Sequence, residues 1–121
     1  MKILTVCQGG NVHSVMARFI LNYHIEPHQD CLAMGWEPNS EETKTMLYEW
    51  ADCIVPMESD IFNKIPEQYR WKVGAVLDVG PDRWGLNSDL LNLVGNLAFS
   101  IDWARVEQTV RDKNPNAATR T

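Results

Sequence analysis

The sequence lacks several features that would place it in a specialised class. No run of apolar residues approaches the ~20 that cross a membrane, and residues 1–6 contain no signal-peptide stretch of useful length. There is no basic run, because 11 Lys and Arg face 16 Asp and Glu for a formal net charge of −5. An acidic chain of this kind has no electrostatic footprint for nucleic acid. We therefore expect a cytoplasmic protein without a nucleic-acid or membrane partner.

Cysteine is scarce and has no metal-binding spacing. The three residues, Cys7, Cys31 and Cys53, are an odd number without a CxxC pair, which disfavours a disulfide framework and a cysteine zinc site. Two histidines in the segment HIEPHQD have helical ligand spacing, but the proline between them breaks that geometry. We expect unpaired thiols, inert at Cys31 and Cys53, with no metal and no cofactor.

What is present describes one ordinary globular domain. Of 121 residues, 45% are apolar and 22% charged, so one core is affordable. We expect the domain to occupy residues 1–112 and a flexible tail to occupy 113–121. Apolar runs at 3–6, 31–34, 53–57 and 73–79 predict strands, and a helix begins near Ser14. Three more helices are expected: 41–51 capped by Asn39 or Ser40, 58–65, and one long helix from Ser88 to about 110.

Strands that alternate with helices and are nearly continuous in apolar residues favour a parallel sheet. The predicted fold is a single-domain α/β fold, a four-stranded parallel sheet flanked by helices on both faces. In such sheets, ligands bind beyond the carboxyl ends of the strands. Cys7, Met57 and the loop that starts at Gly80 all lie at such ends, so these segments are expected to converge.

The segment CQGGNVHS, which joins the first strand to the first helix, carries the strongest chemical signal. Backbone N–H groups in such a turn form an anion-binding nest, and the helix dipole adds positive potential. Both favour the thiolate of Cys7, which is its reactive form, and both favour a bound oxyanion. Gly9 and Gly10 permit close backbone approach, and Ser14 can donate a hydrogen bond to sulfur. The alternative is that Cys7 only fills a tight strand end.

Three segments resemble one family in the same order along the chain. ILTVCQGGNVHSVMAR resembles the N-terminal signature of low-molecular-weight protein tyrosine phosphatases and the related arsenate reductases. WADCIVPMESD resembles the family's third strand and the start of the helix that follows it, and LDVGPDRWGLNSDLL resembles its acid loop and last helix. The resemblance extends to about residue 112 and implies a low-molecular-weight phosphatase-like fold.

The resemblance also implies roles for individual residues. It makes Cys7 the nucleophile that forms a phosphocysteine and Ser14 its supporting hydroxyl. It implies a general acid in the loop at residues 80–85, where Asp82 is favoured over Asp78. The remaining roles are a phosphate-binding loop and a substrate-binding wall, assigned respectively to Gln8, Gly9, Gly10, Asn11 and Val12, and to Trp84 and Trp36.

Two positions depart from the family pattern. The family has Arg six residues after the cysteine, where this chain has His13, which cannot make the bidentate contact of a guanidinium. An adjacent thiolate or phosphate favours the imidazolium, so His13 is a partial replacement. The acid is displaced as well, because the family's Asp falls on Pro81 and Asp82 is one residue later.

These observations leave three functions open. The first is hydrolysis of phosphotyrosine or small aryl phosphomonoesters through Cys7, weakened by His13. The second is a catalytically degenerate relative that binds a phosphorylated ligand or protein. The third is a phosphocysteine carrier of the sugar phosphotransferase IIB type, in which the loop containing Asp82 and Trp84 has no role. The expected partner is a phosphorylated protein or a small phosphomonoester, bound by a monomer or weak dimer.

Overall fold

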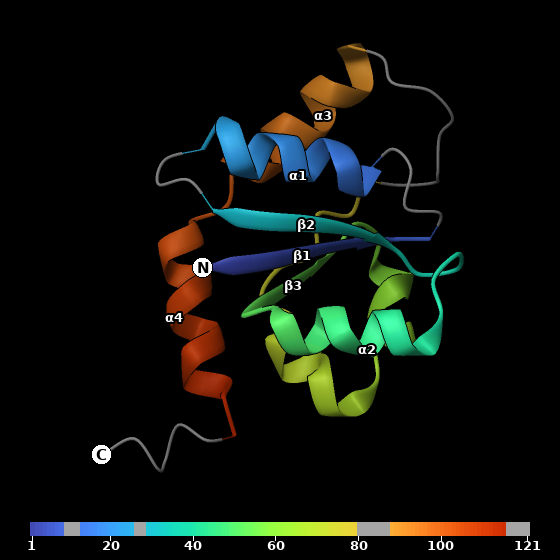
Figure 1. The fold of residues 1–121 in the computed structure, drawn as a ribbon. Helices are drawn as coiled ribbons and strands as arrows, with labels where there is room; N and C mark the ends of the chain where they lie inside the picture. Colours follow the sequence, from blue (N-terminus) through green and yellow to red (C-terminus); the bar gives the residue numbers. More distant parts are fainter. Residues whose placement is uncertain (9–12, 26–28, 80–87, 116–121) are drawn as a thin grey trace.

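The computed structural model describes residues 1–8, 13–25, 29–79 and 88–115 (Figure 1). Its described strands form one parallel sheet in the order β2-β1-β3, with β1 at Lys2–Cys7, β2 at Asp30–Gly35 and β3 at Cys53–Pro56. Every residue of β1 except Lys2 is buried, as expected for a central strand covered on both faces. The α/β class and the parallel sheet are confirmed.

Helices cover the two faces of the sheet (Figure 1). α1 (His13–Tyr23) and α3 (Ser88–Phe99) lie on one face. α2 (Glu41–Trp50) lies on the other face with two 3₁₀ helices, η1 (Ser59–Lys64) and η2 (Glu67–Lys72). α4 (Trp103–Lys113) lies near the amino end of β1. This arrangement leaves the carboxyl ends of the strands on the side away from α4.

The predicted fourth strand, 73–79, is not a regular strand. It follows β3 through one bridge, Ile54 with Val73, and through backbone hydrogen bonds from Gly74, Leu77 and Val79. The donors Gly74 and Leu77 are three residues apart, whereas their acceptors, Ile54 and Pro56, are two residues apart. The regular hydrogen-bond pattern of a parallel ladder is therefore lost. Asp78 then has a φ of 55°, which no strand residue adopts. Among the described residues the sheet therefore has three strands instead of four.

Gly74 lies where β3 and α4 leave no room for a side chain. A Cβ there would lie 2.7 Å from Val106 Cγ1 and 2.9 Å from both Cys53 Sγ and Val110 Cγ2. Side chains of α4 thus pack directly on the backbone of Gly74. The segment 73–79, which was predicted as a strand, is instead a connection packed against both β3 and α4.

The predicted long last helix is divided in two. α3 ends at Phe99, and Asp102 starts α4 by accepting a hydrogen bond from the backbone N–H of Arg105. Trp103, which follows this cap, is buried and donates its indole N–H to Ala98 O at 3.0 Å. The sequence analysis missed Asp102 as an internal cap. For α2 the structure chooses Ser40, whose hydroxyl accepts from Thr43 N.

The helices of the described residues are all too short or too polar to span a bilayer. α4 continues to Lys113, and the remainder of the predicted tail from residue 116 lies outside the described residues. The division into a domain and a tail stays a prediction.

Candidate active site

Cys7 is the last residue of the central strand, beside the start of α1. Its Sγ lies 3.1 Å from Ser14 Oγ. Ser14 is held in place through its backbone, because the hydroxyl of Thr5 on β1 donates to Ser14 O at 2.9 Å. A serine hydroxyl at this distance can donate a hydrogen bond to sulfur, and the bond is stronger when the sulfur is a charged thiolate than when it is a neutral thiol. Strand β1 therefore supplies both the Cys7 thiol and the Thr5 hydroxyl that holds Ser14 next to it.

The thiol of Cys7 has no exposed surface. It belongs to the buried cluster on the α1 face, together with residues such as Ala17 and Met57. A reaction at this sulfur thus requires the site to open when a ligand enters.

The other two thiols are buried, as predicted, and their surroundings are different. Burial raises the pKa of Cys31 to about 12, against smaller lowering effects from a hydrogen bond with Thr5 and from Arg18. Burial likewise raises the pKa of Cys53 to about 12, opposed by the hydrogen bond from Gly74. Both groups are neutral thiols at physiological pH, so neither is a nucleophile.

His13 is the first residue of α1 and is fully buried. Its Nδ1 lies 3.3 Å from Glu58 Oε1, and the Glu58 side chain is 14% exposed. A carboxylate this close stabilises the cationic form of an imidazole. The structure thus places a carboxylate next to the His13 ring, on the segment that follows β3.

Glu58 was not among the predicted site residues. Glu58 comes two residues after Pro56, the end of β3, and β3 is hydrogen-bonded to β1. The signal was available, since carboxyl ends of parallel strands lie together and Glu58 is the first acidic residue after the β3 strand. What the sequence did not show was that β3 is next to β1.

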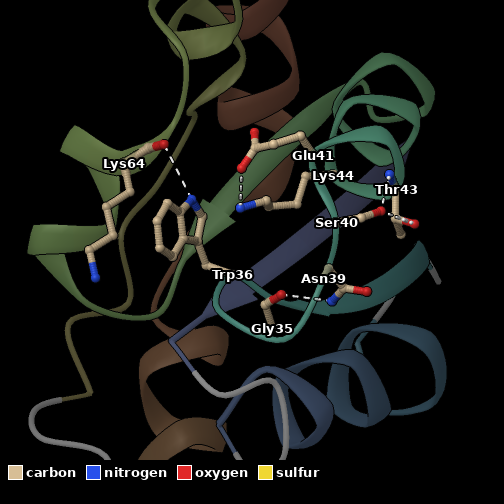
Figure 2. Close-up of polar contacts among 8 residues, drawn as sticks. All are labelled: Gly35, Trp36, Asn39, Ser40, Glu41, Thr43, Lys44 and Lys64. Carbon is tan, nitrogen blue, oxygen red and sulfur yellow. Dashed lines mark hydrogen bonds and ion pairs between the residues drawn. The ribbon is translucent and has the colours of Figure 1, made fainter.

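Trp36 is brought beside the Cys7 loop by backbone hydrogen bonds. Trp36 N donates to Cys7 O at 2.8 Å, and Glu37 N donates to Gln8 O at 2.9 Å. These bonds continue the β1–β2 pairing past the ends of the strands. The turn is closed by Asn39 Nδ2, which donates to Gly35 O at 2.7 Å (Figure 2). Gln8 and Trp36, which were predicted for the phosphate loop and the substrate wall, therefore share one end of the sheet with Cys7, His13 and Ser14.

The structure does not describe most of the remaining predicted site residues. Gly9, Gly10, Asn11, Val12, Asp82 and Trp84 lie outside the described residues. Asp78, the alternative acid, is exposed in the left-handed backbone conformation, which Asp tolerates better than most residues. Within the described ranges, no three His, Cys, Asp or Glu side chains are grouped closely enough to hold a metal ion.

Comparisons with known proteins give a likeness among solved structures. No family model matches the chain, and no curated protein matches it. Among solved structures, the chain is similar to the YwlE arginine phosphatase from Geobacillus stearothermophilus, with a TM-score of 0.54 and 17% sequence identity. The alignment covers 93% of this chain and 88% of that one. At this identity the likeness shows a shared fold, an α/β fold whose parallel sheet is flanked by helices.

Proposed function

We propose that the protein is a phosphatase-like hydrolase that cleaves phosphotyrosine or small aryl phosphomonoesters through a phosphocysteine on Cys7. The observation that carries the proposal is the 3.1 Å contact between Cys7 Sγ and Ser14 Oγ, where the central strand meets the start of α1. A helix N-terminus favours both a thiolate and a phosphoryl group. The fold shared with a solved phosphatase supports the same kind of chemistry.

The reaction has two steps. The Cys7 thiolate attacks phosphorus, the ester P–O bond breaks, and the leaving oxygen takes a proton from an acid, for which Asp82 is the proposed donor. Water then attacks the phosphocysteine, its proton passes to the carboxylate that Asp82 became in the first step, and the P–S bond breaks, so that inorganic phosphate leaves and the thiolate returns. The Ser14 hydroxyl stabilises the thiolate before attack and after release, and the hydrogen bond from Thr5 to the Ser14 backbone carbonyl keeps that residue next to Cys7.

His13 and Glu58 take the place of the missing arginine in this proposal. The imidazolium provides positive charge near the phosphoryl oxygens, and Glu58 keeps the ring charged and oriented. The two N–H groups of an imidazolium point in different directions, and Nδ1 faces Glu58, so the ring cannot make the two parallel donations of a guanidinium. Losing one preorganised donor costs ~10²–10³ in rate, so turnover is expected to be slow.

A second candidate is a protein that binds phosphorylated ligands without hydrolysing them. Two observations favour it: His13 stands where the family has Arg, and the Cys7 thiol has no exposed surface. Binding through backbone amides and the helix dipole requires neither a bidentate cation nor an accessible sulfur.

The two candidates are separated by hydrolysis of 4-nitrophenyl phosphate and by binding of vanadate, measured on the same samples. We expect slow turnover in the wild type, none above background in Cys7→Ser, and a loss of about ten-fold or more in Ser14→Ala, since a hydrogen bond to a charged group contributes about 1.5–3 kcal/mol. Cys53→Ala is the matched control, because it deletes a buried thiol on β3 that pairs with Ile3, near the amino end of β1.

Wild-type activity equal to that of Cys7→Ser, with vanadate still bound, would establish the binding protein instead. Failure to bind vanadate as well would exclude both candidates.

A further inference from the structure

Two lysine side chains lie on the indole of Trp36 (Figure 2). Lys44 Nζ is 4.0 Å from the ring centroid and Lys64 Nζ is 5.0 Å from it. The indole lies between the two side chains in the close-up, and its N–H donates to Lys64 O at 3.3 Å. Ammonium groups at these distances are attracted by the ring's negative face. Trp36 thus contacts two ammonium groups, and it is better suited to hold these charges in place than to stack on an aryl ring.

The two lysines differ in what neutralises them. Lys44 is 4% exposed, and its ammonium lies 2.8 Å from Glu41 Oε1. Lys64 is half-buried, and among the described residues no carboxylate oxygen lies within 4.0 Å of its Nζ. Its polar partner there is a neutral amide, the side-chain oxygen of Gln8. Within the described part of the chain, Lys64 therefore brings a positive charge without a carboxylate partner to this end of the sheet.

Gln8 connects that charge to the candidate nucleophile. It follows Cys7 directly in the chain, and its amide lies between Lys64 and Glu37. The oxygen accepts from Lys64, while Nε2 donates to Glu37 Oε2 at 3.1 Å. An ammonium on one side and a carboxylate on the other permit a single orientation of the amide. The cation and the anion are thus held on defined sides of the residue next to Cys7.

We propose that Lys64 is a specificity residue that binds a carboxylate next to the phosphorylated residue of a peptide substrate. The preferred substrate is then a phosphopeptide with an acidic neighbour, oriented with that neighbour toward Lys64 and away from Glu37. This inference rests on the proposed function, because it assumes that Cys7 receives the phosphoryl group. The chain's net charge of −5 repels an acidic substrate in general, so a local cation next to the site has a selective effect.

The test compares two phosphotyrosyl peptides that differ by Glu or Gln beside the phosphotyrosine. The measured quantity is the ratio of kcat/KM for the acidic peptide to that for the neutral one, and binding of both to Cys7→Ser gives the same ratio without turnover. We expect the wild type to favour the acidic peptide by about two- to five-fold, as for a partly exposed ion pair. The preference should shrink as salt is added.

Variants assign the effect to one residue. Lys64→Gln should bring the ratio to about one, Lys64→Arg should retain the preference, and Glu37→Gln should increase it, because the opposing carboxylate is removed. Lys113→Gln removes the same charge from the exposed end of α4, and its ratio should equal that of the wild type. Circular dichroism and thermal unfolding show whether each variant is folded, and Lys64→Arg keeps the test usable if Lys64→Gln is not.

The outcomes separate this inference from the function beneath it. Peptides that are processed or bound with a wild-type ratio of one, or with a ratio that Lys64→Gln leaves unchanged, overturn the role of Lys64 alone. If neither peptide is hydrolysed or bound, the proposed function and the inference fall together.

Discussion

Cys7 and the pair formed by Cys31 and Cys53 are equally well buried, yet they lie in different chemical settings. Cys31 and Cys53 both pair with Ile3, one from β2 and one from β3, near the amino ends of the strands. Cys7 is at the carboxyl end of the same central strand, 3.1 Å from a serine hydroxyl. The other two thiols each donate a long hydrogen bond to a neighbouring backbone carbonyl, at 3.7 Å and 3.9 Å, and Cys31 also has a hydrogen bond with Thr5. Location along the strand, rather than depth, determines which thiol lies beside a helix N-terminus.

The largest expected contrast is in alkylation. At pH 8, a thiol with a pKa of about 12 is ionised to about one part in 10⁴, so Cys31 and Cys53 should resist iodoacetamide in the folded protein. The Cys7 sulfur is buried in the closed site, but the opening that admits a ligand also admits iodoacetamide, so we expect Cys7 to be modified at least about 10³-fold faster than the other two thiols, and vanadate to protect it. Mass spectrometry of tryptic peptides gives the three rates. Equal resistance of Cys7 would remove the difference between the thiols and, with it, the proposed nucleophile.

A smaller effect is expected on completing the surroundings of Cys7. His13→Arg restores two parallel donors for phosphoryl oxygens, with Glu58 still in place as the counterion. We expect hydrolysis of 4-nitrophenyl phosphate to rise by about 10²-fold or more, following the cost of one preorganised donor. His24→Arg, at an exposed position after α1, is the control for added charge. An unchanged rate for His13→Arg, in a variant that still binds vanadate, would show that this position does not limit the chemistry.

The smallest effect concerns the stability that the inert thiols give. Because the folded pKa of Cys53 is raised to about 12, the folded state keeps a proton that the unfolded chain loses above pH ~9. This contribution is complete below pH ~9 and is lost as the pH rises toward 12, by at most about 1.4 kcal/mol per pH unit per thiol. Urea unfolding at pH 8 and pH 10.5 should show a steeper loss for the wild type than for Cys53→Ala. Parallel losses in the two proteins would mean that Cys53 does not titrate differently on folding.

Much of the fold was predictable from local pattern. The β-branched run before Cys7 and the helical spacing after Ser14 predicted the strand and helix that meet at the site, and both are present. The prediction of a fourth strand was wrong for a reason that the local sequence pattern does not show. VGAVLDV has strand composition, but the approach of α4 to Gly74 and the left-handed conformation of Asp78 depend on tertiary packing.

The candidate site was predictable where it is local and not where it is assembled from distant segments. Cys7 and Ser14 are seven residues apart on one strand–turn–helix unit, so their proximity follows from the motif. Glu58 is 45 residues from His13, and Lys64 is 56 residues from Gln8. Both contacts depend on β3 lying beside β1, which is a matter of strand order. Without the strand order, the sequence shows which residues are present but not which of them lie in contact.

The two backbone hydrogen bonds that join the Trp36 turn to Cys7 and Gln8 have a consequence for how this protein can change. They make the strand end that bears the sulfur and the turn that bears the tryptophan a single mechanical unit. A displacement of one displaces the other, so mutations that retune ligand choice in the turn will also alter the geometry of the thiol. Selectivity and reactivity are then inherited together, and an engineer seeking a new substrate would do better to alter side chains such as Lys64 than to lengthen or shorten that turn.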